Sequence, residues 1–235
     1  MLISGASRGI GLAIAEAALA EGHRLRLGVR GDPLAQAAAA VTELAKRVPE
    51  RVLLHPYEAL EPASAAAWVE ATLHRQGEIG GLIHCAGIFS RVGVGFEDGE
   101  QEEIEAVWRV NVMNPWWLSR ATWPALRAHG DGRVITLVSM SGKRVKGSLS
   151  AYGVSKFALL GLCQALRNEG WAAGIRVTAI CPGWVNTDMA AAVTALPRQG
   201  MTQPKDLAAL ACQLLRQPAS CVPFELAVNC LLETG

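Results

Sequence analysis

Apolar positions along the 235-residue chain follow two alternating patterns. Short runs rich in Leu, Ile and Val alternate with longer stretches rich in Ala, Leu and Glu, in which apolar residues recur at helical spacing. The short runs predict strands at 2–4, 24–29, 52–55, 81–85, 133–138, 175–181 and 225–229. The longer stretches predict helices at about 10–22, 33–47, 62–76, 100–129, 151–171 and 204–216.

This alternation predicts the fold class. A strand that feeds a crossover helix must lie parallel to the next strand, and the helices then cover both faces of the sheet. The chain is therefore expected to form an α/β fold, a doubly wound parallel sheet of about seven strands. Because no linker-like composition interrupts the pattern, residues 1–235 are expected to form one domain, with a substrate loop at about 184–205.

The composition argues against several function classes. The 22 basic and 21 acidic side chains nearly cancel, so the positive excess of a nucleic-acid-binding protein is missing. No apolar run approaches the ~20 residues of a membrane helix, and the chain opens directly on a predicted strand, so we expect a cytoplasmic protein without a membrane partner. The six cysteines never form C-x-x-C and the five histidines are scattered, which predicts reduced core thiols and no metal site.

The turn after the first predicted strand is rich in glycine. Gly5, Gly9 and Gly11 follow this strand and open the first predicted helix. Glycines in such a turn let the backbone approach a pyrophosphate, and the helix N-terminus supplies amide donors. The position of these glycines predicts that the turn binds a dinucleotide.

The end of the second predicted strand indicates which dinucleotide is bound. No acidic residue stands where one would bind the adenosine ribose hydroxyls; Arg30 follows the strand directly, and Arg8 adds a second positive charge from the glycine turn. Both arginines suit a 2′-phosphate. Asp32 is the alternative acid, but its place before Pro33 is explained by helix capping. We therefore expect NADP(H) in preference to NAD(H).

Tyr152 and Lys156 form a candidate proton-transfer pair. They stand four residues apart near the start of a predicted helix and so share one face. A lysine charge about 4 Å from a phenol interacts with it by about 4 kcal/mol at an effective dielectric near 20, which is about three pK units. We expect the phenol pKa to fall from ~10 toward 7, where the group can act as a general acid or base. The alternative is an exposed Tyr/Lys pair on a helix surface.

Ser139 ends the predicted strand 133–138, and open parallel sheets bind ligands at the carboxyl ends of their strands. Its hydroxyl is therefore placed to bind a substrate carbonyl. Ser141 is a rival that strand geometry alone does not separate. G-x-S-x-G is absent around both serines, so the pattern does not indicate a serine hydrolase.

Together these motifs resemble the short-chain dehydrogenases/reductases over essentially the whole chain. The family's serine lies thirteen residues before its tyrosine, and this spacing selects Ser139 over Ser141. The resemblance implies a Rossmann-type fold, a homodimer or homotetramer, and an NADPH-dependent carbonyl reductase that interconverts a carbonyl compound and a secondary alcohol. It also implies that Tyr152 transfers the proton, that Lys156 lowers the phenol pKa and binds the nicotinamide ribose, and that Asn111 holds a water in a proton relay.

The resemblance extends to the cofactor site, with two departures. The family's N-N-A-G segment reads His84-Cys85-Ala86-Gly87, which replaces two amide side chains, and the acid expected to meet the adenine is Glu58 rather than aspartate. The segment Cys181–Thr187 resembles the family's P-G segment, which holds the nicotinamide carboxamide. The implied cofactor residues are Gly5, Ser7, Arg8, Gly9, Ile10, Gly11, Arg30, Glu58, Cys85, Ala86, Gly87, Tyr152, Lys156, Pro182, Gly183, Val185 and Thr187.

The substrate side is less defined. Residues placed to line the pocket are largely apolar and suggest a hydrophobic carbonyl compound; they are Phe89, Met140, Val145, Trp184, Met189 and the segment 190–203. The loop 142–147 carries three positive charges, Lys143, Arg144 and Lys146. These charges either steer an anionic substrate or belong to a solvated loop or subunit contact.

Two non-catalytic alternatives stand beside the enzyme. One is an NADP-binding regulator, for which the altered His84-Cys85 leaves room. The other is a scaffold within an oligomer, because the helices at 100–129 and 151–171 carry apolar surface that includes Trp108, Trp116, Trp117 and Trp123. The intact set of Asn111, Ser139, Tyr152 and Lys156 favours the enzyme.

Overall fold

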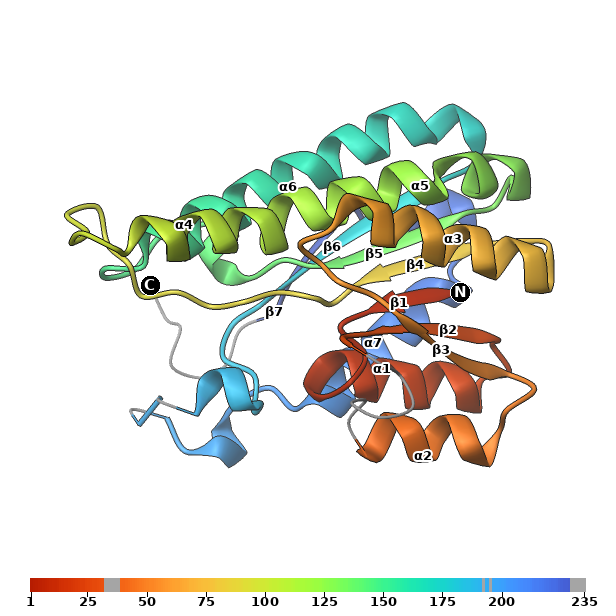
Figure 1. Ribbon diagram of the computed structural model, residues 1–235, viewed down its shortest axis with the longest axis horizontal. Coiled ribbons are helices and arrows are strands. Elements are labelled where there is room, and N and C mark those ends of the chain that lie inside the picture. The colour runs from red at the N-terminus through yellow and green to blue at the C-terminus, as the bar shows by residue number, and fades with distance from the viewer. Residues whose placement is uncertain (32–38, 192, 195, 229–235) are drawn as a thin grey trace.

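Seven parallel strands form one sheet in the order β3-β2-β1-β4-β5-β6-β7 (Figure 1). The structure is a computed structural model that describes residues 1–31, 39–191, 193–194 and 196–228. The strands are β1 (Leu2–Ser4), β2 (Leu25–Val29), β3 (Val52–Pro56), β4 (Gly81–His84), β5 (Arg133–Leu137), β6 (Arg176–Pro182) and β7 (Glu225–Val228). The predicted doubly wound parallel sheet is confirmed, and each strand lies within one residue of its predicted bounds.

The helices form a layer on each face of the sheet (Figure 1). They are α1 (Gly9–Ala20), α2 (Ala39–Arg47), α3 (Pro62–Gln76), α4 (Gln101–Trp108), α5 (Asn114–His129), α6 (Ser150–Gly170) and α7 (Pro204–Arg216). One apolar core lies between the sheet and α1, α2 and α7, and a second lies between the sheet and α3, α5 and α6. Neighbouring side chains of β1 point to opposite faces of the sheet: Leu2 packs in the second core and Ile3 in the first. The predicted cap at Asp32-Pro33 lies outside the described residues.

The stretch predicted as one helix over 100–129 is interrupted by a π-helical turn. Residues Arg109–Met113 form this turn between α4 and α5. A π-turn inserts an extra residue into a helix and is frequent at functional sites. Here it holds Asn111, whose side chain is fully buried.

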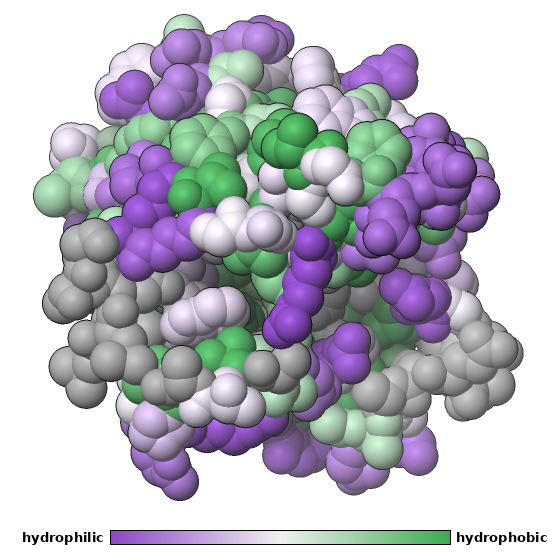
Figure 2. All heavy atoms as spheres, turned by 90° about the vertical axis from the view of Figure 1, so that its left-hand side faces the viewer, coloured by the Kyte–Doolittle hydropathy of each residue, from purple (hydrophilic) through white to green (hydrophobic). Residues whose placement is uncertain are grey.

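Parallel pairing brings the carboxyl ends of all seven strands to one edge of the sheet. The chain leaves β1 through the glycine turn, and β1 lies between β2 and β4, so the order of the strands reverses there. Open α/β sheets bind ligands at such a switch point. Figure 2 faces this edge and shows a hollow in which apolar surface adjoins hydrophilic side chains.

Two further findings concern the described residues. Among them, no helix is both long enough and apolar enough to cross a bilayer. Within the same ranges, no group of three or more His, Cys, Asp or Glu side chains is placed to hold a metal ion. The described cysteines are free thiols; they are Cys85, Cys163, Cys181, Cys212 and Cys221.

Candidate active site

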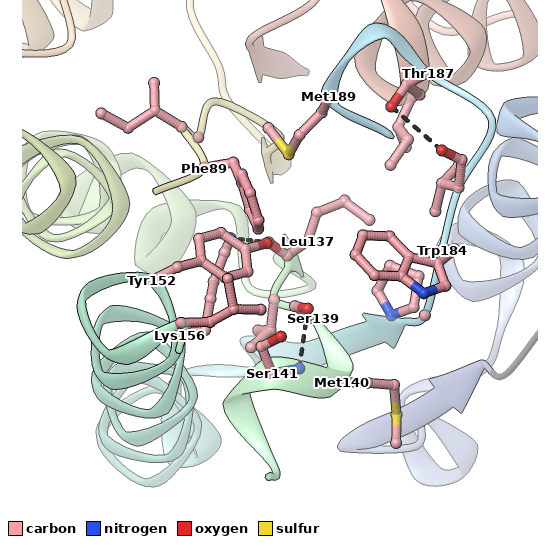
Figure 3. Close-up of a pocket in the computed structure, with 18 of the residues that line it drawn as sticks. Phe89, Leu137, Ser139, Met140, Ser141, Tyr152, Lys156, Trp184, Thr187 and Met189 are labelled. Atoms are coloured by element: carbon pink, nitrogen blue, oxygen red, sulfur yellow. Dashed lines mark hydrogen bonds between the residues drawn. The ribbon is translucent and has the colours of Figure 1, made fainter. Parts of the chain in front are cut away.

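A cavity of about 220 Å³ opens at the carboxyl edge of the sheet (Figure 3). The three side chains predicted for proton transfer, Ser139, Tyr152 and Lys156, all line it. Ser139 follows β5, whereas Tyr152 and Lys156 lie on the first turns of α6. The topology therefore brings together residues that the sequence could relate only by their spacing.

Tyr152 is a buried tyrosine that lines this cavity. Its ring packs against Phe89 with the centroids 5.0 Å apart (Figure 3). Burial raises the pKa of Tyr152 above its ordinary value, and the hydrogen bond with the Ser139 side chain acts in the opposite direction more weakly. The predicted lowering of the phenol pKa by Lys156 is therefore wrong for this structure. The reason is that desolvation of the buried phenol is the largest effect on its pKa, and the Lys156 ammonium is not among the groups that shift it.

Lys156 lies one helical turn after Tyr152 and is only 5% exposed. Its Nζ donates a hydrogen bond to the carbonyl oxygen of Leu137 at 3.1 Å, which ties α6 to the end of β5. Burial lowers the pKa of this ammonium to about 8. An exposed Tyr/Lys pair on a helix surface is thus excluded, because both side chains are buried at the cavity.

The geometry distinguishes Ser139 from Ser141, although both line the cavity. The Ser139 Oγ accepts a hydrogen bond from the Ser141 backbone N–H at 3.0 Å, and the Ser139 side chain is the group that acts to lower the pKa of Tyr152. The amide occupies an acceptor site of the hydroxyl, so the hydroxyl proton stays available for donation. This arrangement agrees with the choice of Ser139.

Asn111 connects three segments of the site. Its side chain pairs with the backbone of Ile88, accepting from N–H and donating to C=O at 2.9 Å each, as a strand would. Its Nδ2 also donates to Ser155 Oγ at 3.0 Å, and that hydroxyl donates to the Tyr152 carbonyl at 2.7 Å. Asn111 therefore holds the segment after β4 against α6.

The glycine turn is packed so closely that only glycine fits. A Cβ at Gly5, where φ is +67°, would lie 2.6 Å from Ala86 N, and one at Gly11 would lie 2.3 Å from Gly5 O. Gly9 faces Thr187, whose Cγ2 would be 3.3 Å from an added Cβ. The segments after β1, β4 and β6 thus converge with backbone exposed to one cleft. This glycine cradle at a helix N-terminus fits a dinucleotide.

His84 and Cys85, the departures from the family's amides, are both accommodated as neutral groups. The His84 Nε2 lies 2.9 Å from Ser119 Oγ on α5, and burial lowers the pKa of the ring to about 3. Burial raises the pKa of the Cys85 thiol to about 12. Backbone support of this segment comes instead from Ser4, whose carbonyl and hydroxyl accept the Cys85 N–H at 3.2 and 3.3 Å. Ser4 is not among the residues that the sequence predicts for the site.

The charged residues expected at the adenosine end lie along the same edge. Arg30 is exposed directly after β2. Arg8 is ion-paired with Asp188 at 3.4 Å, and both side chains are exposed, at 77% and 75%. The Glu58 carboxylate accepts the Leu60 N–H at 3.2 Å and so supports the turn before α3. Cofactor residues that line the cavity are Ile10, Cys85, Gly87, Tyr152, Lys156, Pro182, Gly183, Val185 and Thr187.

The apolar wall matches most of the prediction. Phe89, Met140, Trp184 and Met189 line the cavity (Figure 3). Val145 does not: its Cγ2 would lie 2.9 Å from a Cβ at Gly153, so it packs on α6. The predicted contribution of 190–203 is also wrong for the described residues, because the buried ones form a small cluster of their own: Ala190, Leu196 and Met201, against Trp184 and Val193.

The cationic loop after β5 is divided between two environments. Lys143 is ion-paired with Glu225 of β7, whereas Arg144 and Lys146 line the cavity. Leu149, directly before α6, also lines the cavity and is not among the residues that the sequence predicts for it. Its apolar character and its place three residues before Tyr152 were the available signal.

Comparisons with known proteins agree with this geometry. A sequence model of the short chain dehydrogenase family matches residues 1–197. Agropine synthesis reductase of Rhizobium rhizogenes is 34% identical over 236 residues, which cover 100% of this chain and 53% of that protein. The putative ketoacyl reductase of the monensin polyketide synthase of Streptomyces virginiae is 33% identical over 208 residues, which cover 87% of this chain and 76% of that protein.

Comparison with solved structures also indicates the short-chain dehydrogenase family. The crystal structure of a short-chain dehydrogenase from Streptomyces avermitilis superimposes with a TM-score of 0.83 at 28% identity, covering 97% of this chain and 87% of that one. This chain spans about half the length of the agropine synthesis reductases that it matches. From the family match, the doubly wound sheet and the residues gathered at its edge, we conclude that the chain belongs to the short-chain dehydrogenase family of oxidoreductases.

Proposed function

We propose that the chain is an NADP(H)-dependent reductase that interconverts a carbonyl compound and a secondary alcohol. The observation that carries this proposal is the shared cavity of Ser139, Tyr152 and Lys156, in which the serine hydroxyl, the phenol and the buried ammonium all line one wall. The nicotinamide cofactor, when bound, supplies the hydride that reduces the carbonyl carbon. The protein supplies position, charge and a proton.

The phenol of Tyr152 donates that proton to the carbonyl oxygen. Its raised pKa keeps it neutral at neutral pH, so it is ready to act as an acid. Ser139 donates its hydroxyl proton to the same oxygen and orients it. Lys156 then stabilises the phenolate that remains, because its ammonium is held beside the ring by Leu137 O.

The resupply of the proton runs past Asn111 and Lys156 in this proposal. A Cβ at Gly87 would lie 3.3 Å from Asn111 Oδ1 and 3.7 Å from Lys156 Nζ. Glycine therefore leaves a space that adjoins both polar groups, and a water there would bridge them. Asn111 is thus a positioning residue for the relay that the family resemblance implies.

The preference for NADP(H) rests on the positive charge at the adenosine end. Arg30 and Arg8 would hold the 2′-phosphate, while the glycine turn and the segment 182–187 would hold the pyrophosphate and nicotinamide. To bind the phosphate, Arg8 must break its ion pair with Asp188. An exposed ion pair contributes only about 0–1 kcal/mol, so this exchange costs little.

The substrate loop at 184–205 forms part of the proposal, since Trp184 and Met189 from it line the cavity.

We also propose a homo-oligomer assembled through α4, α5 and α6. Four large apolar side chains on these adjacent helices are exposed by 42–55%, namely Trp108, Trp116, Val154 and Phe157. Light scattering measures the assembly, and a monomer at micromolar concentration would contradict it.

The decisive experiment is Tyr152→Phe, assayed as NADPH oxidation with a panel of ketones, ketoacyl thioesters and quinones, beside NADH. We expect NADPH binding to be retained and turnover to fall at least a hundredfold, or about 2.7 kcal/mol of barrier. Tyr57→Phe is the matched control, because it removes the other phenol of the chain at a buried site beside Asn114. Near-normal turnover by Tyr152→Phe would contradict the mechanism. NADPH binding without turnover of any carbonyl would favour a non-catalytic regulator.

A further inference from the structure

The three cationic side chains of the loop between β5 and α6 lie in two different surroundings. The Lys143 ammonium is ion-paired with Glu225 of β7, and this hydrogen bond raises the pKa of Lys143. The pairing fixes the loop to the sheet edge. Arg144 and Lys146 instead line the cavity that contains Ser139.

The loop is held in this orientation by further contacts. The Arg144 backbone N–H donates to Met140 O at 3.1 Å, which closes the turn after β5. Val145, between the two cations, packs toward Gly153 on α6. Arg144 and Lys146, the residues on either side of Val145, line the cavity and do not pack on α6 as Val145 does.

The charge of the cavity wall is one-sided. Among the described residues that line it, three are cationic, Arg144, Lys146 and Lys156, and none is acidic. Lys156 is already assigned to the phenol, so Arg144 and Lys146 are the further cations that this wall presents to a substrate. Cations that line a partly enclosed cavity attract anions and raise their local concentration.

Resting on the proposed function, we propose that the substrate is a small carbonyl compound that carries an oxyanion, a carboxylate or a phosphate, bound by Arg144 and Lys146. Its carbonyl oxygen lies at Ser139 and Tyr152, and its apolar body contacts the wall that includes Phe89. A guanidinium binds either oxyanion through paired hydrogen bonds, and an ammonium adds a point charge. The bound substrate therefore spans from the proton donor to the loop.

The first test compares kcat/KM for 4-oxopentanoate, its amide and 4-oxopentyl phosphate. The readout is the ratio of each anion to the amide, measured in wild type, Lys146→Gln, Arg144→Gln and Lys143→Gln. We expect this ratio to be at least ten in wild type for one of the two anions. In Lys146→Gln and Arg144→Gln we expect the ratio to fall about tenfold, or by about 1.4 kcal/mol. The anion with the higher ratio identifies carboxylate or phosphate as the recognised group.

Lys143→Gln is the matched control, since it removes the same charge from the same loop outside the cavity. We expect it to leave the ratio unchanged even where a loosened loop lowers both rates. A wild-type ratio near one, or equal losses in all three variants, would overturn the inference. Reduction of the amide would in that case still uphold the proposed function.

A second measurement is independent of turnover. Pentanoate and pentanamide lack the reducible ketone, and ligand-observed NMR at millimolar concentration reports their binding. We expect wild type to prefer the carboxylate and Lys146→Gln to lose this preference; pentyl phosphate serves as the phosphate arm. Equal binding of the anions and the amide would overturn the inference, whereas loss of all reductase activity with the preference intact would count only against the proposed function.

Discussion

Replacing Lys156 by methionine should stabilise the fold while it abolishes activity. The ammonium is 5% exposed, and its Nζ donates to Leu137 O at 3.1 Å. Burial lowers the pKa of Lys156 from 10.5 to about 8, so folding at neutral pH removes a charged group from water against its preference. Methionine keeps a similar length and flexibility without the charge.

The magnitude follows from linkage. A difference of one pKa unit corresponds to about 1.4 kcal/mol, so the fall from 10.5 to about 8 costs the folded state about 3 kcal/mol at pH 7. The folded-state pKa lies below the unfolded value, and the unfolded chain therefore binds more protons between pH 8 and 10.5. The cost is fully present below pH 8 and disappears toward pH 10.5. Loss of the hydrogen bond to Leu137 offsets about 1 kcal/mol, which leaves a net gain of about 2 kcal/mol.

Urea unfolding between pH 7 and 10 measures this difference, with nucleotide removed because binding would add its own stabilisation. The advantage of Lys156→Met should shrink steadily above pH 8. Lys143→Met, at the lysine paired with Glu225, should show no such gain at pH 7. The reasoning is refuted if Lys156→Met is less stable than wild type at pH 7, or if its advantage does not change with pH.

Two other predictions concern the cofactor and the core. Arg30→Ala should weaken NADPH binding about tenfold or more, because a hydrogen bond to a charged group contributes about 1.5–3 kcal/mol. Calorimetric titrations should show that NADH binding is nearly unchanged. Equal losses of affinity for NADPH and NADH would contradict the role assigned to Arg30. Wild-type stability should fall below pH 6.5 by up to about 1.4 kcal/mol per pH unit, since the unfolded chain gains a proton that the buried His84, with its pKa near 3, does not accept. His84→Asn should remove that part of the slope in urea unfolding at pH 4.5–7, and an unchanged slope would exclude His84 as its source.

Local patterns determined the elements and the order of the motifs. Run length and periodicity are properties of neighbouring residues, so the seven strands could be predicted to within a residue. The turn at Gly5, Gly9 and Gly11 was equally visible, because the need for glycine there is a backbone property. Once the strands are parallel, their carboxyl ends must meet, and this alone brings Ser139 to the helix of Tyr152.

Tertiary structure decided what depends on partners far along the chain or on burial. The π-turn at Asn111 faces Ile88 and Ser155, which are 23 and 44 residues away, and no local pattern reports such contacts. The pKa of Tyr152 rises rather than falls because desolvation is set by all the surrounding atoms, whereas sequence spacing reports only the lysine. Lys143 and Lys146 look alike in sequence; only the position of Glu225, 82 residues after Lys143, separates the lysine that anchors the loop from the one that faces the cavity.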